Sequence, residues 1–365
     1  MFAEAGLEAL DDAGVAPGEV EALYYGNFMG EMADHQGHQG PMMAEAIGAD
    51  GVGATRYESA CASAGAAVRQ GVRDVRNGEA DLVVVGGAER MTNIGTSGAT
   101  EALSIAADDL YEVNMGMTFP GAYALMARAY FDQLGGGTED LAHIAVKNHE
   151  NALENEHAQL QREITLEDHA GAPQLASPLG LFDACPITDG AAAIVLASEE
   201  YADEHGLDDT VAITGTGQGG DRLALQDRED ITETPAAANA ADEAYDDAGI
   251  GPDDVDFAEV HDCFTIAEVL AAEALGLFEK GEGISKAREG VTTRDGEMPI
   301  NVSGGLKAKG HPVGATGASQ IAQITMLLRG DHGRSDAVDG ASTAVAHNAG
   351  GTAASTTVHV LEVSD

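Results

Sequence analysis

Basic residues, tryptophan and cysteine are scarce in this sequence of 365 residues. It has 18 Lys and Arg against 62 Asp and Glu, a formal net charge of −44 at pH 7. This charge excludes nucleic acids and anionic membranes as partners, because their phosphates would be repelled. The acids are spread along the chain, which indicates a folded acidic surface. Such surfaces are typical of halophilic proteins, whose self-repulsion is screened by salt. An acidic protein of ordinary cells is the alternative.

Paired cysteines and long apolar runs are missing as well. The three cysteines are too few for a secreted disulfide framework, and MFAEAGLEAL lacks the basic residues that open a signal peptide. The longest apolar runs, LVVVGG and AAAIVLAS, fall far short of the roughly 18 residues that a membrane span needs. The sequence therefore predicts a cytoplasmic protein with no membrane partner.

Short apolar segments alternate with Ala-rich stretches. Continuous apolar runs without polar alternation predict strands covered on both faces, at residues 80–89, 191–198, 211–217, 342–351 and 355–363. Helices are expected over residues 61–76, 236–248 and 313–329. This alternation is typical of a layered α/β fold.

Two segments of the sequence resemble each other. Residues 11–27 read DDAGVAPGEVEALYYGN and residues 246–262 read DDAGIGPDDVDFAEVHD, at a constant offset of 235 positions. A duplication therefore predicts two related halves with reactive side chains at equivalent loops. A strand at Val211 opens the second half and has no counterpart in the first. We expect the N-terminal sheet to lack that strand, and the authentic protein to be longer or this chain to start at an internal Met.

The two halves differ by an insertion. The second-half strands 342–351 and 355–363 nearly adjoin, whereas a long segment separates their first-half counterparts. We expect an N-terminal half of residues 1–91 with 186–207, an inserted loop domain of residues 92–185, and a C-terminal half of residues 208–365. The insertion is rich in Met, His and aromatic residues that suit a pocket. A structural lid or an oligomer contact is the alternative.

Cys61 stands in ESACASAG at the start of an expected helix. A thiol there meets the positive end of the helix dipole and unpaired amides, which favours the thiolate. A buried structural cysteine is the alternative. His311 lies in GGLKAKGHPVGATG, where Gly314–Gly317 matches Cys61–Ala64 at an offset of 253. The symmetry predicts the imidazole beside the thiol, as a base and an oxyanion donor. A capping or core histidine is the alternative.

EVHDCF contributes two more candidates. His261 and Cys263 are two residues apart on an extended segment, so both side chains can point into one site. The second thiol suits acid/base work at a carbon centre. His347, in AVAHNAGG, is expected at the turn of the final hairpin, where the Gly-rich backbone supplies amide donors to an oxyanion.

Other signals are weaker. GTGQGG at residues 215–220 formally fits a dinucleotide-binding loop, but no convincing helix follows it. His35 and His38 have metal-like spacing without a CxxC pair or an HExxH helix, so no metal site is predicted. Cys185 is interpreted as a buried structural thiol.

Together these motifs resemble the thiolase superfamily, in particular archaeal acetyl-CoA acetyltransferases and sterol-carrier-protein type thiolases. The likeness spans nearly the whole chain and includes ESACASAG, EVHDCF, GGLKAKGHPVGATG and HNAGG. It implies a duplicated fold, layered α-β-α-β-α, with two mixed five-stranded sheets, the first N-terminal strand missing, and an inserted loop domain.

The resemblance also implies an activity, the reversible Claisen condensation of two acetyl-CoA to acetoacetyl-CoA and CoA. Cys61 would be the ping-pong nucleophile, activated by His311, which also contributes to an oxyanion hole. His261 would act in that hole through a water. The backbone around Ala349 and Gly350 would complete a second hole with the amide of Cys61.

Cys263 would be the acid/base of the condensation. Many biosynthetic thiolases hold this cysteine in a C-terminal CxG motif, where this chain has His347. Coenzyme A thioesters would be substrates and no cofactor is expected. The insertion would hold most of the coenzyme, with a local basic cluster or a dependence on high salt to offset the acidic field.

The resemblance implies a homodimer or tetramer, and partners that feed mevalonate synthesis, namely a hydroxymethylglutaryl-CoA synthase and a small OB-fold protein. The alternatives are a degradative 3-ketoacyl-CoA thiolase, a decarboxylating ketoacyl synthase, and a non-catalytic acyl-CoA-binding scaffold. Cys263 argues against the synthase, and the intact reactive set argues against the scaffold.

Overall fold

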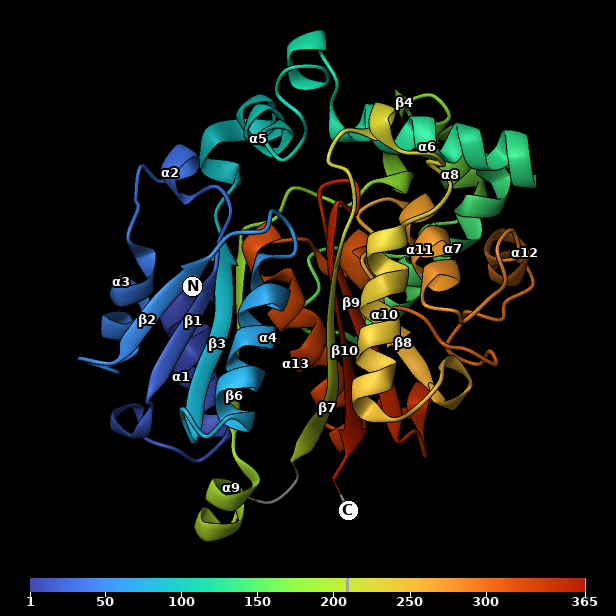
Figure 1. Cartoon of the computed structure of the whole chain (residues 1–365). Coiled ribbons are helices and arrows are strands. Elements are labelled where there is room, and N and C mark those ends of the chain that lie inside the picture. The colour runs from blue at the N-terminus through green and yellow to red at the C-terminus, as the bar shows by residue number, and fades with distance from the viewer. Residues whose placement is uncertain (208–209, 365) are drawn as a thin grey trace.

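Two β-sheets flank a central pair of helices in the computed structural model, which describes residues 1–207 and 210–364 (Figure 1). The central helices are α4 (Ser63–Arg76) and α13 (Thr316–Arg329). The outer face of the first sheet is covered by α1 (Phe2–Asp12) and α3 (Gln39–Ala46), and that of the second by α10 (Pro235–Ala248) and α11 (Thr265–Ala274). The layers therefore run α-β-α-β-α.

The first sheet has the strand order β2-β1-β3-β6. The central strand β1 (Ala22–Gly26) is parallel to β2 (Gly53–Tyr57) and to β3 (Leu82–Glu89), whereas β6 (Gly190–Ala197) is antiparallel to β3. Every residue of β6 is half-buried, because this strand forms an edge of the sheet. Within the described residues no strand pairs with its outer side.

The second sheet has the order β7-β10-β9-β8. Its strands are β7 (Val211–Gly220), β8 (Phe257–Glu259), β9 (Thr343–Gly350) and β10 (Ser355–Val363), and only the β8–β9 pair is parallel. A single bridge from Ala258 to Ile300 extends the sheet beyond β8. The first sheet thus has four strands and no neighbour outside β6 among the described residues, as expected for a half that lacks its first strand. The second sheet also has four strands, and the single bridge of Ile300 stands where a fifth was expected.

The internal duplication is visible in matching elements. The short 3₁₀ turns Pro17–Glu19 and Pro252–Asp254 each begin with proline and lie 235 positions apart. α4 and α13 both have 14 residues and lie 253 positions apart. The apolar residues between the sheets, among them Val83, Ile321 and Leu361, are almost inaccessible and form one core.

Two glycines let α4 lie close to α13 and to the second sheet. A Cβ on Gly317 would lie 2.4 Å from the amide nitrogen of Gly65, and a Cβ on Gly65 would lie 2.1 Å from Oγ1 of Thr357. Real Cβ atoms do not come this close to other heavy atoms, so only glycine fits at the crossing. The loops that precede the two helices, with Cys61 and His311, are thereby brought together.

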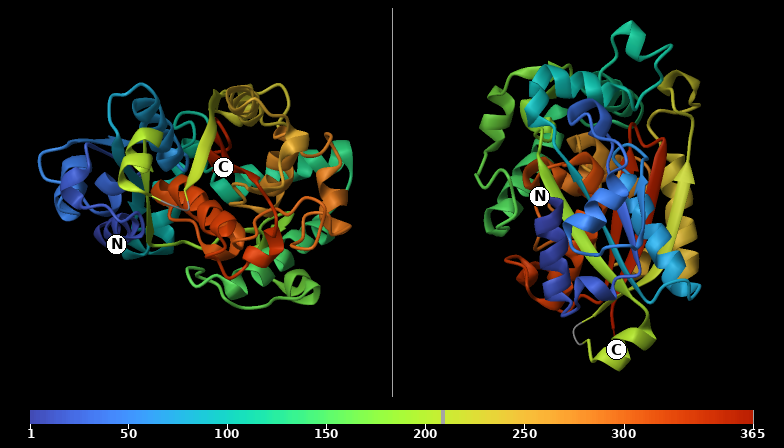
Figure 2. Two further views of the ribbon diagram at one scale, coloured as in Figure 1. Left: turned by 90° about the horizontal axis from the view of Figure 1, so that it is seen from below. Right: turned by 90° about the vertical axis from the view of Figure 1, so that its left-hand side faces the viewer.

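The segment between β3 and β6 folds on the second half of the chain. It contains α5 (Gly95–Ser104), α6 (Phe119–Leu134), α7 (Thr138–Asn151), α8 (Leu166–Gly171) and the hairpin of β4 (Gln174–Ala176) and β5 (Leu179–Gly180). α6 and α7 pack on α11 around one apolar core. Figure 2 shows the molecule from two further sides. The predicted border before residue 208 lies outside the described residues, and the predicted division into three domains stays a prediction.

The short helices α2 (Gly30–Ala33), α9 (Glu199–His205) and α12 (Gly283–Arg288) complete the fold. The GTGQGG segment forms the second part of β7, and a Cβ on Gly215, Gly217 or Gly219 would lie within 2.1 Å of a carbonyl oxygen of α10. These glycines therefore let α10 lie directly on the strand.

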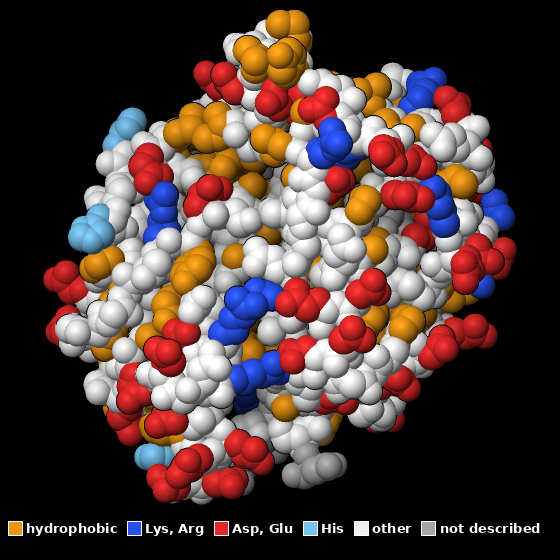
Figure 3. Space-filling model, viewed as in Figure 1, with side chains coloured by type: hydrophobic (Ala, Val, Ile, Leu, Met, Phe, Trp, Pro, Cys, Tyr) orange, Lys and Arg blue, Asp and Glu red, His pale blue; other side chains and the backbone are white. Residues whose placement is uncertain are grey.

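Acidic side chains are spread over the face shown in Figure 3, and basic ones are few. None of the helices in the described part of the chain is long and apolar enough to cross a membrane.

Candidate active site

Loops from both halves of the chain meet at one point between the sheets. The side-chain donor atoms of Cys61, His261 and His311 all lie within 4.8 Å of one another. Cys61 precedes α4, His261 follows β8, and His311 precedes α13. The duplication therefore supplies the scaffold, and the loops at corresponding ends of its elements supply the chemistry.

The loop that carries Cys61 is held in a strained conformation. Ala60 has a φ of 49°, in the left-handed region that residues with a Cβ seldom adopt. Ser63, at the start of α4, secures the loop, because its Oγ donates to the Ala60 carbonyl at 2.6 Å and accepts from the Ser59 amide at 2.9 Å. Cys61 is thereby fixed at the N-terminus of α4, as predicted.

The thiol of Cys61 is neutral in this environment. Burial raises the pKa of Cys61 to about 12, and a hydrogen bond from the Gly351 amide offsets this only in part. This shift is opposite in direction to the effect expected of the helix N-terminus, because desolvation of the charged form raises the pKa more than the hydrogen bond lowers it. A neutral thiol needs a base at the moment it attacks.

His311 has the proton arrangement that such a base requires. The Thr316 hydroxyl donates to the Pro312 carbonyl at 3.1 Å and so accepts the His311 Nδ1–H at 2.7 Å. Nε2 is then unprotonated and free to take a proton. Burial, together with nearby Lys309, lowers the pKa of His311 to about 3. The imidazole is therefore neutral at physiological pH.

His261 has the opposite tautomer. The Asn348 amide donates to His261 Nδ1 at 3.2 Å and to the Cys61 carbonyl at 3.0 Å. The proton of His261 therefore lies on Nε2, which is buried and has no hydrogen-bond partner. A buried N–H without an acceptor suits an oxyanion, whose charge it would stabilise. Burial and the neighbouring His311 and His347 hold the pKa of His261 far below its usual range.

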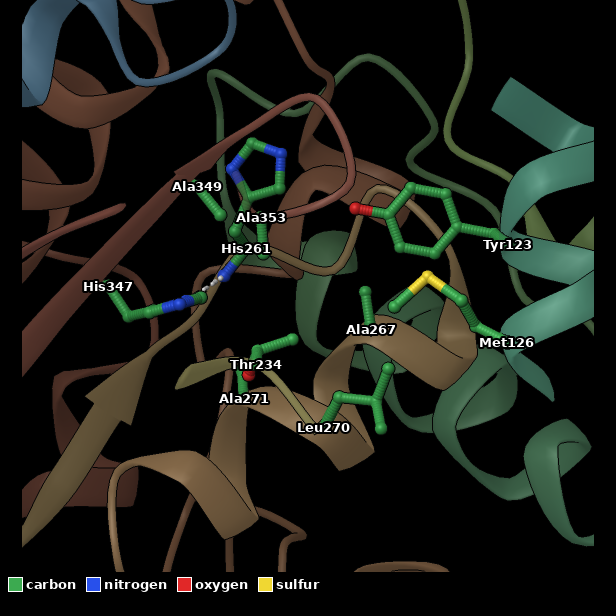
Figure 4. A pocket seen from close by; sticks show the side chains of 10 residues that line it. All are labelled: Tyr123, Met126, Thr234, His261, Ala267, Leu270, Ala271, His347, Ala349 and Ala353. Atoms are coloured by element: carbon green, nitrogen blue, oxygen red, sulfur yellow. Dashed lines mark hydrogen bonds between the residues drawn. The ribbon is translucent and has the colours of Figure 1, made fainter. Parts of the chain in front are cut away.

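His347 was expected at the turn of the final hairpin. It lies within β9 instead, because β9 continues to Gly350. Its Nδ1 accepts the His261 amide at 3.3 Å (Figure 4). Its proton is therefore on Nε2, which is again unpartnered and buried. Both histidines line a cavity of about 10 Å³, which has room for about one water.

The backbone after His347 contacts the loop that carries Cys61. Gly350 packs against the Ser59 carbonyl, and a Cβ there would lie 2.4 Å from that oxygen. The amide that hydrogen-bonds the Cys61 thiol is that of Gly351, whose φ is +62°. Ala349 lines the cavity beside His347. The oxyanion role predicted for Ala349 and Gly350 stays a prediction.

Cys263 is buried beside the same site, and Cys185 is its neighbour. The Cys185 amide donates to the Cys263 carbonyl at 3.0 Å, and Ala184 bridges to Phe264. Burial and the other two cysteines raise the pKa of the Cys263 thiol well above its usual value. All three cysteines of the chain therefore gather at one centre. The sequence reading of Cys185 as a structural thiol missed this proximity.

Buried polar groups position the His261–Cys263 loop. The carboxylate of Asp262 accepts the Leu306 amide at 2.6 Å and the Asn148 side-chain amide at 2.7 Å. Glu268 accepts from Lys147 at 2.5 Å and from Asn148 at 3.1 Å. Burial, with the charge of Glu268, raises the pKa of Asp262. Asn148 and Lys147 lie on α7, in AVKNHEN of the insertion.

Glu89 joins the two halves at the end of β3. Its carboxylate accepts the amides of Phe28, Met29 and Gly314 at 2.9 to 3.1 Å. Burial raises the pKa of Glu89 to about 7. Gly314 lies in the His311 loop, so this acid helps to place the base relative to the first half. The sequence signal that could have indicated this role is the acidic residue that ends the apolar run LVVVGGAE.

A cleft of about 430 Å³ opens beside the nucleophile loop. It is lined by Ala60, Gly350, Gly351, the insertion residues Ile105 and Ala106, and Arg56 among others. Two buried cations, Lys307 and Lys309, lie in the loop before His311. Within the described residues, one group of side chains could hold a metal ion, namely Cys61, His261 and His311. The atoms that would bind the ion are the ones that the acyl chemistry would use.

Comparisons with known proteins agree with this geometry. The model of the thiolase N-terminal domain matches residues 1–200, and that of the thiolase C-terminal domain matches residues 217–363. The fold and the paired Cys–His loops define an α/β protein built for acyl chemistry. The chain belongs to the thiolase family.

Two relatives illustrate its range. An acetyl-CoA acetyltransferase of Methanothermobacter thermautotrophicus is 42% identical over 99% of this chain and 93% of its own length. The benzoylsuccinyl-CoA thiolase subunit BbsB of Thauera aromatica is 36% identical over 89% of this chain and 83% of its own length. A solved structure, "Ltp2-ChsH2(DUF35) aldolase", is similar with a TM-score of 0.81 at 26% identity, covering 99% of this chain and 91% of that one.

Proposed function

We propose that this protein is an acetyl-CoA C-acetyltransferase that forms or cleaves acetoacetyl-CoA. The observation that carries the proposal is the convergence of Cys61, His261 and His311 within 4.8 Å, with the second thiol of Cys263 beside them. The similarity to the Methanothermobacter acetyltransferase over nearly the whole chain supports the substrate.

In the first half-reaction His311 Nε2 takes the proton of Cys61 as the sulfur attacks the thioester carbonyl of acetyl-CoA. The Nε2–H of His261 stabilises the oxyanion of the tetrahedral intermediate. The carbon–sulfur bond to coenzyme A breaks, the proton passes from His311 to the leaving thiolate, and Cys61 is acetylated. Because the thiol and imidazole are both neutral at rest, proton transfer accompanies attack.

In the second half-reaction Cys263 first gives up its own thiol proton to solvent, and its thiolate then removes an α-proton from a second acetyl-CoA. The resulting carbanion attacks the acetyl carbonyl on Cys61, and the carbon–sulfur bond to Cys61 breaks. The proton taken by Cys263 passes to the Cys61 thiolate, acetoacetyl-CoA leaves, and Cys263 regains a proton from solvent, which restores the enzyme. The amide of Gly351 and the Nε2–H of His347 are placed to support the charges that form.

Two variants test these assignments. Cys61→Ala should show no acetylated protein by mass spectrometry after incubation with acetyl-CoA. Cys263→Ala should still be acetylated at Cys61, yet lose condensation and thiolysis by about 10³-fold or more. Cys185→Ala is the matched control, since it removes the third thiol without a proposed role. Full thiolysis by Cys263→Ala would disprove the acid/base assignment.

A degradative thiolase with a larger substrate is the second candidate. The identity to benzoylsuccinyl-CoA thiolase subunit BbsB and the 430 Å³ cleft favour it. Thiolysis rates with acetoacetyl-CoA and with longer or aromatic 3-ketoacyl-CoA substrates distinguish the two. A kcat/KM that rises with acyl size favours the degradative enzyme, and one that falls favours the acetyltransferase.

The proposal also covers the partners, the oligomeric state and the location of the protein. The solved structure "Ltp2-ChsH2(DUF35) aldolase" carries two protein names, which supports a small partner for this chain, such as the predicted OB-fold protein. The synthase partner, the supply of mevalonate synthesis, the homo-oligomer and the cytoplasmic location rest on the sequence. If salt screens an acidic surface, KM for acetyl-CoA should fall as KCl rises. A flat profile would exclude that screening role.

A further inference from the structure

A tyrosine of the insertion reaches the centre of the site. Tyr123 lies on α6 in FPGAYALMARAYF and its side chain is only 3% exposed. Its hydroxyl donates to the Gly351 carbonyl at 3.0 Å, and its ring stacks on Phe264 with centroids 4.7 Å apart. In Figure 4 the phenol points from α6 toward the loop that carries Ala349 and Ala353.

Tyr123, Cys263 and Phe264 lie in one buried cluster, and the phenol lowers the pKa of the Cys263 thiol through a side-chain hydrogen bond. Gly351 therefore connects the two reactive sulfurs, because its amide donates to Cys61 and its carbonyl accepts from Tyr123. The stacked Phe264 is the residue that follows Cys263, so the ring also fixes the backbone on which the thiol is carried. The contact joins the insertion to the C-terminal half.

The Tyr123 phenol can form a hydrogen bond with either protonation state of the Cys263 thiol. It has one O–H donor and free lone pairs. When Cys263 is protonated, the phenol donates to Gly351 and accepts the S–H. When Cys263 is a thiolate, rotation of the hydroxyl turns the donor to the sulfur. A hydrogen bond to an ionised acceptor is the stronger of the two, so the phenol favours the thiolate.

We propose that Tyr123 is a positioning residue of the condensation step, which orients Cys263 and stabilises its thiolate by a hydrogen bond from the phenol. The inference rests on the proposed role of Cys263 as acid/base, which it deepens. It assigns the insertion a part in proton transfer in addition to any part in holding the coenzyme.

The groups around Cys263 act in opposite directions on it. Burial, Cys185, Cys61 and Asp262 all raise the pKa of the thiol, whereas the hydrogen bond from Tyr123 lowers it. Arg228 faces the phenol from the loop after β7 and favours its ionised form. Removing the hydroxyl should therefore leave Cys263 harder to ionise.

The first test measures the thiol without the reaction. In a Cys61→Ala, Cys185→Ala background, Cys263 is the remaining cysteine, and its alkylation by iodoacetamide is followed from about pH 7 to about pH 11. Tyr123→Phe keeps the stacked ring, and it should slow alkylation about 10-fold at a given pH and move the profile up by about one unit. An unshifted profile would overturn the proposal.

Tyr130→Phe is the matched control. Tyr130 lies on the same helix, is fully buried, and donates its hydroxyl to Glu273 away from the thiols. It should leave the alkylation profile unchanged although it also removes a buried hydroxyl. An equal shift in both variants would mean a general loosening of α6 and would contradict a specific contact. Replacement of Tyr123 by 3,5-difluorotyrosine keeps the hydroxyl, strengthens the donor, and should move the profile down.

The second test separates the half-reactions. Tyr123→Phe should acetylate Cys61 within about 2-fold of the parent, whereas condensation and thiolysis should fall about 10- to 100-fold with an acidic limb shifted to higher pH. Equal losses in both half-reactions would contradict the proposal. If Cys263→Ala keeps thiolysis, the proposed function fails at that residue, while the alkylation profile still decides whether Tyr123 stabilises the thiolate.

Discussion

The two halves of the chain share a scaffold but present their loops differently. The nucleophile loop of the first half, residues 58–61, is exposed or half-buried, whereas residues 260–264 and 300–311 of the second half are all buried. In the proposed reaction Cys61 meets an acyl group that enters through the adjoining cleft. The histidines have to stay neutral, and water has to be kept from the Cys263 thiol. Burial does both. Duplication therefore kept the elements and let exposure and side chains of the loops diverge.

The sheets differ in the same sense. β10 lies between β7 and β9, and its central residues are buried, whereas β6, its counterpart beside β3, is half-buried along its length. The half that carries four of the five proposed catalytic side chains has the better covered sheet. Loops that must hold a geometry to fractions of an ångström gain from a rigid support.

The largest expected effect comes from replacing His311, the proposed base, which the second half contributes. His311→Asn should lower the rate of Cys61 acetylation about 10²- to 10³-fold, because a neutral thiol then has no proton acceptor. Rapid-quench mass spectrometry measures the rate. His332→Asn removes another buried histidine of this half, bonded to Gln323, and should stay within about 3-fold. Equal effects of the two changes would argue against a specific base.

The helix crossing is the point where both halves depend on each other. Gly317→Ala places a methyl 2.4 Å from the Gly65 amide nitrogen of α4 and should lower the free energy of unfolding by about 2–3 kcal/mol. Gly171→Ala, at the end of α8, meets nothing within 4 Å and should change it by less than about 0.5 kcal/mol. Urea unfolding in concentrated KCl compares them. A tolerated alanine at position 317 would mean that the helices can separate without loss.

Stability should respond to pH with opposite signs in the two halves. Burial lowers the pKa of His359 in β10 to about 4, so its contribution is present above its unfolded pKa and is lost as pH falls. Burial raises the pKa of Glu89 to about 7, so its contribution is present at low pH and is lost as pH rises through 7.

Two variants measure these contributions between about pH 5 and pH 7. His359→Gln should reduce the loss of unfolding free energy on acidification by roughly 1–2 kcal/mol, whereas Glu89→Gln should steepen it by a similar amount. Urea titrations at several pH values give both slopes. Slopes that change in the same direction in the two variants would refute the contrast.

The smallest expected effect compares the two sheets directly. Val360→Ala, at a fully buried position of β10, should cost about 2–3 kcal/mol of unfolding free energy, and Val195→Ala in the half-buried β6 about 1 kcal/mol. Chemical denaturation resolves this difference if the transition is cooperative. Equal costs would indicate that β6 is covered in solution.

Much of the scaffold follows from local pattern. The strand expected over residues 80–89 is found at Leu82–Glu89, that over 355–363 at Ser355–Val363, and the helix expected over 61–76 at Ser63–Arg76. Apolar runs and Ala-rich stretches decide these elements because their burial does not depend on one particular partner. The repeat also predicted that the first sheet lacks a counterpart of β7. In the second sheet the fifth strand is reduced to the single bridge of Ile300, since pairing at an edge depends on neighbours that no local pattern specifies.

The sequence predicted which residues form the candidate site, but it did not predict their protonation states. The repeat offset placed Cys61 beside His311, because equivalent loops meet across a pseudosymmetric core. The pKa of the Cys61 thiol did not follow from the sequence, since the helix dipole is a local property and desolvation of the thiol is not. Tyr123 and Asp262 carried no signal of their role, because their partners are far away in the sequence.

The sequence by itself determined the family, the duplicated halves and the residue types at the reactive loops, because these depend on composition, spacing and internal repetition. Only the tertiary structure decided which histidine nitrogen carries the proton, that the Cys61 thiol rests neutral, and that a phenol of the insertion reaches Cys263. These properties depend on burial and on hydrogen bonds between distant segments, and burial exists only once the layers have packed.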